Sequence, residues 1–211
     1  MKVKLKSDFI DFYDHWFDNE GIIFERMTKN ELSRSQMFSI FDQYHIATPK
    51  HGKVKDLILE LSPYDWVVVY LDEYEHQGKG KIFGNINYAA SNYPSYYASQ
   101  YIPSQATSIR ELWLGDYHFV LQYSSDDTWR SNVGNVEICI KANNPLMQNK
   151  RVFDYPIYAI DYIAYPNVIT GDIDYLAIDL NTSPMVRGTG IENIVSAIEI
   201  ANSIKKYIKK G

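Results

Sequence analysis

The chain has 211 residues, 45% of them hydrophobic, so it can bury a core as one domain or as two closely joined lobes. Its formal net charge of −5 argues against a broad nucleic-acid surface, because binding a phosphate backbone requires clustered Lys and Arg. The single cysteine, Cys139, excludes an intramolecular disulfide, and its alternating strand-like surroundings indicate a structural role.

The termini and the apolar runs carry no sign of membrane insertion or secretion. Residues 1–7 are basic but are followed by aspartates rather than by an apolar segment, so a secretory signal is not expected. The longest apolar run, residues 66–71, is far too short to span a bilayer. We therefore expect a cytoplasmic protein with no membrane partner.

The N-terminal half mixes helical and strand patterns. Its apolar spacing predicts helices over residues 7–18, 31–45 and 56–61, and strands over residues 22–24 and 66–70. Thr28 and Glu31 stand at the spacing of a capping box, which places the start of the second helix near them. The Tyr- and Ser-rich segment 85–105 is predicted to be a loop-like interruption.

The C-terminal half has two hairpin patterns and ends in a helix. It predicts strands over 110–114, 117–123, 136–141, 158–164 and 175–180, and a helix over 191–209. The helix prediction rests on apolar residues at helical spacing, which are Ile194, Ala197, Ile198, Ala201 and Ile204. The predicted class is α+β, with mainly antiparallel sheets and flanking helices.

The second predicted hairpin is acidic. Asp179 and Asn181 are two residues apart on one strand and so share a face. If the turn is centred near Thr170, Asp161 lies across from Asp179, to within a residue or two. Opposed like charges are destabilising, which favours a cation between them, and Mg²⁺ prefers such oxygen ligands. The alternative is that both carboxylates are simply solvated.

The sequence around this hairpin resembles a known family. Residues 177–184 read Ala-Ile-Asp-Leu-Asn-Thr-Ser-Pro, and residues 188–192 read Gly-Thr-Gly-Ile-Glu. This pattern resembles the C-terminal half of an ATP-grasp domain, in particular the ribosomal-protein glutamate ligase branch. In that branch an acidic residue before Asn-Thr/Ser-Ser-Pro and an upstream Asp hold the Mg²⁺ ions on ATP. The resemblance implies that Asp161, Asp179 and Asn181 bind metal.

Two further stretches resemble the catalytic motifs of the same branch. Residues 129–134, Trp-Arg-Ser-Asn-Val-Gly, resemble the aromatic-Arg-Ser-Asn stretch that lines the phosphates and the acceptor. Residues 108–110, Ser-Ile-Arg, resemble its Asp-Ile-Arg. The resemblance implies catalytic places for Arg110, Arg130 and Asn132.

Three other matches imply contacts with the nucleotide. Residues 99–103 resemble the hinge whose backbone binds adenine, and residues 77–81 resemble the glycine-rich phosphate loop. Ser33-Arg34 resembles the start of a helix that carries a Lys. The implied ATP-binding residues are Arg34, Lys79, Lys81, Gln100, Tyr101 and Ile102.

The chain also departs from the family pattern. Tyr70 stands where the strand normally ends in an ATP-binding Lys, although Lys79 and Lys81 could supply charge from another direction. Arg34 replaces a Lys, Gln100 a Glu, and Asp179 the usual Glu. The separate N-terminal domain of many relatives is not expected, because only about 30 residues precede the match.

The resemblance implies a fold and a reaction. A short extension, residues 1–30, would precede an ATP-grasp domain whose lobes, about 31–105 and 106–211, enclose a nucleotide cleft. The domain would use ATP and Mg²⁺ to form an acyl phosphate from a small-molecule or peptide carboxylate, and then an amide with an amine. The pattern leaves the oligomeric state open.

Two alternatives remain from other classes of function. Tyr70 favours a degenerate ATP-grasp protein that binds a nucleotide or a partner without catalysis. A tyrosine cluster favours a module that binds single-stranded nucleic acid, although packing or a lid explains it better; its members are Tyr88, Tyr93, Tyr96 and Tyr97. The histidines show no metal-ligand spacing, so zinc is not expected.

Overall fold

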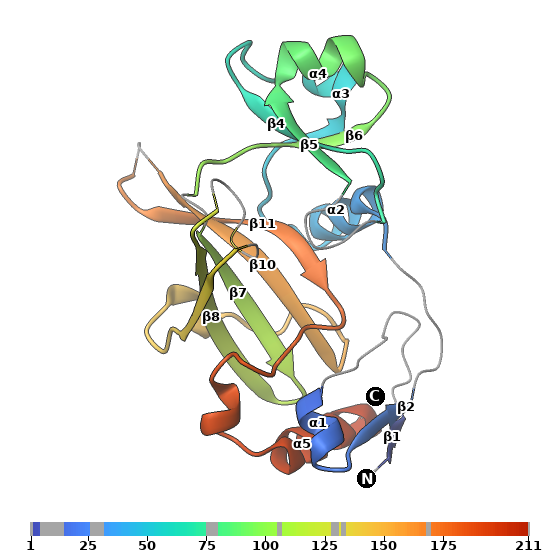
Figure 1. Cartoon of the computed structure of the whole chain (residues 1–211), viewed down its shortest axis with the longest axis vertical. Helices are drawn as coiled ribbons and strands as arrows, with labels where there is room; N and C mark the ends of the chain where they lie inside the picture. The colour runs from blue at the N-terminus through green and yellow to red at the C-terminus, as the bar shows by residue number, and fades with distance from the viewer. Residues whose placement is uncertain are drawn as a thin grey trace.

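The computed structural model describes residues 2–4, 15–25, 32–74, 80–104, 107–127, 131, 134–167 and 170–210. Two antiparallel sheets form the body of this part of the chain, with strand orders β11-β10-β7-β8-β9 and β3-β6-β4-β5. β1 (Lys2–Lys4) and β2 (Ile23–Glu25) form a separate parallel pair. In Figure 1 the four-stranded sheet occupies one end of the molecule, and the five-stranded sheet extends toward the other.

The four-stranded sheet and two short helices form a unit that we call the upper lobe. Its elements are β3 (His51–Lys53), α3 (Val54–Leu57), β4 (Trp66–Tyr70), β5 (Lys81–Asn85), α4 (Ile86–Asn92) and β6 (Tyr97–Gln100). Val67 and Val69 pack against α3 and α4, whereas Val68 and Tyr70 belong to a core shared with the larger sheet. Because strand side chains alternate, the lobe turns the Tyr70 side of its sheet toward the rest of the molecule.

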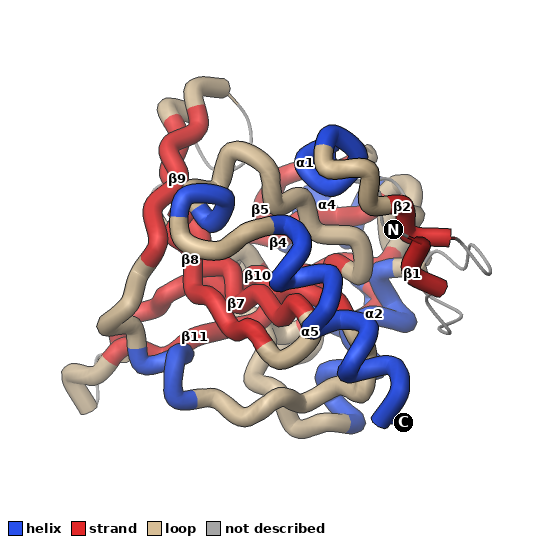
Figure 2. Tube along the Cα trace, turned by 90° about the horizontal axis from the view of Figure 1, so that it is seen from below, coloured by secondary structure: helices blue, strands red, loops and turns tan. Residues whose placement is uncertain are grey.

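The five-stranded sheet is buried on both faces. Its strands are β7 (Thr107–Leu114), β8 (Tyr117–Ser125), β9 (Val136–Ile140), β10 (Ile157–Pro166) and β11 (Ile173–Asn181). Leu112 and Leu114 pack with α1 (His15–Asn19) and α5 (Ala197–Lys210), which lie below the β7–β8 turn (Figures 1 and 2). Trp113 and Ile160 pack on the opposite face with α2 (Arg34–Gln43). Two 3₁₀ turns complete the fold, η1 (Pro145–Gln148) and η2 (Ile191–Asn193).

The strand predictions and the α+β class are confirmed. The predicted strand over residues 66–70 is β4. The strands of both hairpins are present and longer than predicted, because pairing extends the β-structure beyond the apolar pattern. The predicted pairing of Asp161 with Asp179 is confirmed, but it depends on a register shift next to Asp161, because Tyr162 pairs with Ala177 and Ile178 is left as a β-bulge.

Two of the predicted helix boundaries are wrong. The helix predicted over 31–45 begins at Arg34, because Ser33 and Gln36 form the capping box. Gln36 N donates to Ser33 Oγ, and Ser33 N donates to Gln36 Oε1. The helix predicted over 191–209 is interrupted: η2 ends at Asn193, and α5 starts after Ser196, whose hydroxyl accepts from Glu199 N.

The N-terminal half differs in three further places. The helix predicted over 56–61 is the short α3, which starts and ends earlier. The segment 85–105, predicted to be loop-like, contains α4 and β6: the Asn85 side chain caps α4, and β6 is buried between β3 and β4. Of the helix predicted over 7–18, residues 7–14 lie outside the described residues, and α1 begins at His15.

The described helices are also informative about membranes. None of them combines the length and the hydropathy that a bilayer-crossing segment requires.

Substitution of Gly115, in the β7–β8 turn, tests how closely α5 packs against this turn. Its φ is +60°, and a Cβ there would lie 2.5 Å from the backbone N of Ile204. We expect Gly115→Ala to lower the free energy of unfolding by about 1–2 kcal/mol for the left-handed backbone and by a further 1–3 kcal/mol, roughly, for the clash. Gly171→Ala is the matched control, because Gly171 has φ +78° with nothing within 4 Å. Equal losses for the two variants in urea unfolding would contradict this docking.

Candidate functional site

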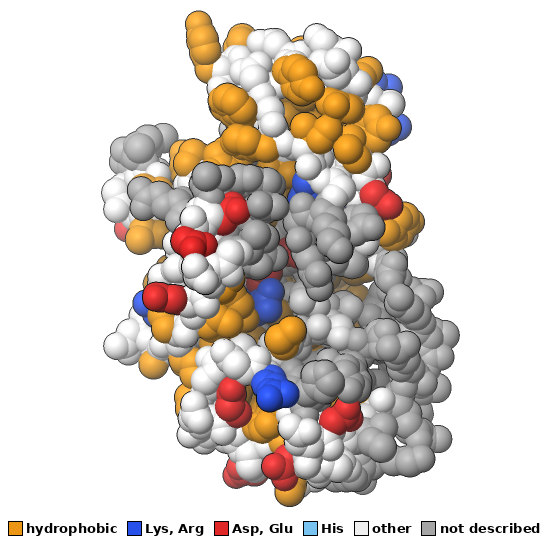
Figure 3. All heavy atoms as spheres, in the orientation of Figure 1, with side chains coloured by type: hydrophobic (Ala, Val, Ile, Leu, Met, Phe, Trp, Pro, Cys, Tyr) orange, Lys and Arg blue, Asp and Glu red, His pale blue; other side chains and the backbone are white. Residues whose placement is uncertain are grey.

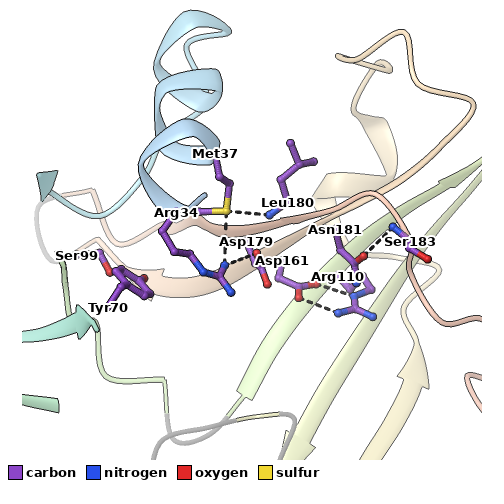
Figure 4. A network of polar contacts seen from close by, with 10 residues as sticks. All are labelled: Arg34, Met37, Tyr70, Ser99, Arg110, Asp161, Asp179, Leu180, Asn181 and Ser183. Carbon is purple, nitrogen blue, oxygen red and sulfur yellow. Dashed lines mark hydrogen bonds and ion pairs between the residues drawn. The ribbon is translucent and has the colours of Figure 1, made fainter. Parts of the chain in front are cut away.

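Four charged side chains line up where α2 meets the edge of the five-stranded sheet (Figure 4). Asp179 on β11 pairs with Asp161 on β10, and Asp161 pairs with Arg110 on β7. The three side chains therefore share one face of three neighbouring strands. Arg34, from α2, reaches Asp179 past the open edge of β11. The result is a row in which two adjacent carboxylates lie between two guanidinium groups.

Arg110 and Asp161 form a forked ion pair. Arg110 Nε and Nη2 donate to the two carboxylate oxygens of Asp161 at 2.6 and 2.8 Å. Arg110 Nη1 also donates to the Tyr123 hydroxyl at 3.2 Å, and its guanidinium lies 4.7 Å from the centre of that ring. Burial opposes the charge on Arg110, but the attraction of Asp161 outweighs it, so the pKa of Arg110 is raised. This geometry fixes the guanidinium in position.

Arg34 and Asp179 form the second pair. Arg34 Nη1 donates to Asp179 Oδ1 at 2.5 Å, and only 4% of the Arg34 side chain is exposed. Burial disfavours the charged form, but the neighbouring Asp179 carboxylate leaves the pKa of Arg34 raised. The Met37 sulfur also holds this junction, since it accepts from Arg34 Nη1 at 3.7 Å and from Leu180 N at 3.2 Å. The pair thus ties α2 to β11.

Tyr70 lies beside Arg34 and is buried. Its hydroxyl is 2.9 Å from Ser99 Oγ, and its ring centre is 5.6 Å both from Arg34 Cζ and from Lys81 Nζ. Burial raises the pKa of Tyr70, although Arg34 and the Ser99 hydrogen bond oppose the increase. An aromatic ring attracts cations, so Tyr70 keeps Arg34 and Lys81 close to the position where the ATP-grasp pattern has a lysine.

The predicted hinge, residues 100–102, connects β6 with the larger sheet. Gln100 N donates to Lys50 O and Tyr101 N to Trp66 O, both at 2.7 Å, and Ile102 is buried. The Tyr101 ring meets Phe83 edge-on at 4.6 Å, and Phe83 stacks on Trp66 at 4.8 Å. Trp66 and Phe83 are partly exposed, and Figure 3 shows hydrophobic side chains gathered on this lobe. The hinge therefore adjoins an aromatic surface.

The predicted metal ligands have the right chemistry for Mg²⁺. Asp161, Asp179 and Asn181 offer carboxylate and amide oxygens, and an ionised carboxylate has about four lone-pair sites, so a guanidinium does not exhaust it. Asn181 Oδ1 accepts from Ser183 N at 2.8 Å. The two arginines already balance the two carboxylates, so charge repulsion alone no longer requires a metal. Within the described residues, no three His, Cys, Asp or Glu side chains gather as a metal site.

The structure brings the charged residues at the centre of the predicted site together. Arg34, Arg110, Asp161 and Asp179 are in contact through the two ion pairs, and Lys81 joins them through Tyr70. The other predicted residues Lys79, Arg130 and Asn132 lie outside the described residues. Sequence reasoning missed Tyr123, yet the register of the β7–β8 hairpin places it diagonally across from Arg110 on the same face.

Comparison with known proteins identifies the architecture. No protein-family model and no curated protein matches the chain. A structure of the ATP-grasp ligase PsnB, complexed with a phosphomimetic variant of its minimal precursor, Mg and ADP, superposes with a TM-score of 0.57 at 10% identity, covering 84% of this chain and 59% of PsnB. The chain has the ATP-grasp fold.

Two other solved structures also superpose on the chain. The RimK domain protein of Sphaerobacter thermophilus DSM 20745 gives a TM-score of 0.51 at 15% identity, over 85% of this chain and 67% of that one. D-alanyl-alanine synthetase A of Vibrio cholerae O1 biovar eltor str. N16961 gives 0.58 at 10% identity, over 92% and 71%. The ATP-grasp fold of this chain thus spans about three fifths of the PsnB ligase, and the predicted antiparallel two-sheet architecture is confirmed.

Removing one partner of the forked pair tests its contribution to stability. Arg110→Met would leave the Asp161 carboxylate, whose side chain is 16% exposed, without its guanidinium. We expect the free energy of unfolding to fall by about 3–5 kcal/mol, because an uncompensated buried charge remains. The double variant Arg110→Met/Asp161→Asn should recover part of that loss in urea unfolding. Additive losses would show that the two residues do not interact.

Proposed function

We propose that the chain binds ATP beside Arg34 and Arg110 and acts as an ATP-dependent carboxylate–amine ligase. One observation carries the proposal: two carboxylates on paired strands, Asp161 and Asp179, lie between two fixed guanidinium groups within an ATP-grasp fold. Such a row supplies oxygen ligands for a divalent ion and fixed positive charge for phosphates at the same place.

The structural neighbours support the choice of nucleotide and substrate. PsnB was crystallised with Mg, ADP and a precursor, and the Vibrio cholerae neighbour is a D-alanyl-alanine synthetase. Both are ligases, and they support ATP with Mg²⁺ as the energy source and a peptide or a small molecule as the partner. The specific carboxylate and amine are part of the proposal.

The roles of individual residues follow from their positions. Asp161, Asp179 and Asn181 would hold Mg²⁺, which when bound neutralises part of the phosphate charge. Arg110 is oriented by Asp161 and stabilises negative charge that develops on the transferred phosphoryl group. Lys81 and Arg34, both beside the Tyr70 ring, would take the place of the missing strand lysine. Arg34 would have to share or release Asp179 to reach a phosphate.

In the proposed reaction these side chains position the reacting groups. A substrate carboxylate attacks the γ-phosphorus, and the guanidinium of Arg110 is already fixed where the charge spreads. The acyl phosphate that forms is attacked by an amine, which yields the amide and phosphate. Residues 100–102 would bind the adenine through the Tyr101 ring and through backbone groups other than the N–H groups of Gln100 and Tyr101, which donate to Lys50 O and Trp66 O.

A second candidate function is nucleotide binding without turnover. Two observations favour it: Tyr70 is buried in place of the lysine, and Arg34 already occupies one oxygen of Asp179. Equilibrium titration with ATP and Mg²⁺, followed by a search for ADP, separates the candidates. Binding without ADP release, in the presence of pooled carboxylates and amines, would establish this second function instead of the ligase.

Asp179→Asn is the sharpest test of the ligase. The amide keeps the shape and the acceptor for Arg34 but removes the charge from the proposed metal ligand. We expect ADP release, assayed with Mg²⁺ and pooled amino acids, peptides and polyamines, to fall by about 100-fold or more.

Asp174→Asn is the matched control for this experiment. Asp174 lies on the same strand, β11, but is exposed and hydrogen-bonded to Asn167 Nδ2 at 2.8 Å. It should keep the parent rate. Parent-like turnover in Asp179→Asn would rule out the metal assignment.

A further inference from the structure

A polar pocket opens beside Tyr70. It has a volume of about 490 Å³ and lies between the start of α2, the segment after β4 and the start of β6. Its lining residues are Ser33, Ser35, Tyr70, Leu71, Asp72, Glu73, Tyr74, Ser95, Tyr96 and Tyr97. None of the proposed metal ligands is among them. The pocket is large enough for a small metabolite or a long side chain of a peptide.

The described lining favours a cation. It contains two carboxylates, several hydroxyls and the rings of Tyr74, Tyr96 and Tyr97, but no lysine or arginine. Asp72 Oδ1 accepts from Tyr74 N at 2.9 Å, and Glu73 Oε2 accepts from Ser35 N at 2.9 Å. These bonds hold the carboxylates in place and leave further lone pairs on each. Carboxylates and tyrosine faces together attract an ammonium ion.

The pocket also adjoins the charged network. Tyr97, Tyr70 and Lys81 are direct partners across β6, β4 and β5, so their side chains stand next to one another on the same face. The Tyr70 ring lines the pocket, and its centre lies 5.6 Å both from Arg34 Cζ and from Lys81 Nζ. A group bound at Tyr97 would therefore lie one side chain away from the cations assigned to the phosphates.

A chain of hydrogen bonds leads from Tyr97 through His51 to the exposed carboxylate of Asp42. The Tyr97 hydroxyl is 2.8 Å from His51 Nδ1, and His51 Nε2 is 3.3 Å from Asp42 Oδ1. The Phe38 ring stacks on His51 at 4.4 Å and fixes its plane. Because Asp42 accepts only, neutral His51 carries its proton on Nε2, and Nδ1 accepts from Tyr97. The phenol oxygen can then accept a proton from the pocket.

The charged surroundings of Tyr97 keep its phenol neutral. Burial, together with the carboxylates of Asp42 and Glu73 and the nearby Tyr70, raises the pKa of Tyr97 well above its ordinary value. A neutral phenol can pass a proton on but does not itself become a stable base. Lys53, the partner of Tyr97 on β3, and Asp72, Tyr74 and Tyr96 of the pocket lining are further titratable groups near it.

We propose that this pocket binds the primary ammonium group of the amine acceptor, and that Tyr97, positioned by His51 and Asp42, takes up its proton. The assignment rests on the proposed ligase function and names the substrate class for its second half. It requires an acceptor that is positively charged in solution, such as an alkylamine, a polyamine or a lysine side chain.

The proposed step balances in protons and electrons. One proton moves from the ammonium nitrogen to the Tyr97 oxygen while the phenol proton moves to His51 Nδ1, and Asp42 stabilises the resulting imidazolium. The freed lone pair forms the C–N bond with the acyl carbon. The C–O bond to phosphate breaks, and the departing phosphate keeps that electron pair and takes the second proton of the nitrogen.

Binding of a simple ammonium probe tests the pocket without ATP or turnover. Titration with n-butylammonium at neutral pH should shift the backbone amide NMR signals of Tyr74 and Ser95–Tyr97, and 1-butanol, its neutral counterpart, should not. Asp72→Asn/Glu73→Gln should weaken the ammonium about fivefold or more. Asp56→Asn/Glu60→Gln removes the same charge from exposed positions on the same lobe and should leave the affinity unchanged.

The outcomes separate this assignment from the ligase proposal. Equal shifts with 1-butanol, or equal weakening in both double variants, would overturn the ammonium site even if ATP is hydrolysed. Ammonium binding in a chain that does not bind ATP would instead leave the pocket in place and remove the ligase.

The proton path has its own readout. Hydroxylamine is uncharged near neutral pH and need not lose a proton before it attacks an acyl phosphate. With the carboxylate that supports ADP release, Tyr97→Phe and His51→Gln should each lower kcat for an alkylammonium acceptor about 100-fold more than kcat for hydroxylamine. The KM for the ammonium should change less than its kcat. Equal losses with both acceptors would show that Tyr97 and His51 act only on structure.

Discussion

The rest of the site depends on the paired carboxylates of Asp161 and Asp179, which require positive charge nearby. Two like charges on neighbouring strands are stable only when positive charge lies close by. Here Arg110 approaches along the sheet and Arg34 approaches from a helix outside it. The charge balance of the sheet edge therefore depends on where α2 sits, and α2 in turn is held by packing in the same core as the upper lobe.

The hairpin part of this arrangement could be predicted from the sequence. Alternation along a strand has a period of two, so a turn near Thr170 predicts Asp161 opposite Asp179 to within a residue or two. The β-bulge at Ile178, which the pattern does not indicate, makes the pairing direct. Arg110 was predicted by its resemblance to a motif, and its contact with Asp161 follows from the next pair of strands. Local rules suffice wherever neighbours in sequence are also neighbours in the sheet.

Other contacts could not be predicted, because they join distant segments. Arg34 and Asp179 are 145 residues apart in sequence, and only the docking of α2 brings them together. The segment 85–105 was misjudged for a similar reason: Ala98 and Ser99 are buried because β6 inserts between β3 and β4, which no local pattern indicates. The Asp42–His51–Tyr97 chain draws on three elements and has no sequence signature.

Helix α2 carries Arg34 in its first turn and Asp42 near its last residue, and the rise of an α-helix separates them by about 12 Å. A helix this short moves as one rigid body, so any ligand that displaces one end also displaces the other. Such a displacement links the two ends thermodynamically. If a ligand at the first end changes the affinity for a ligand at the second end, the second ligand changes the affinity for the first by the same factor.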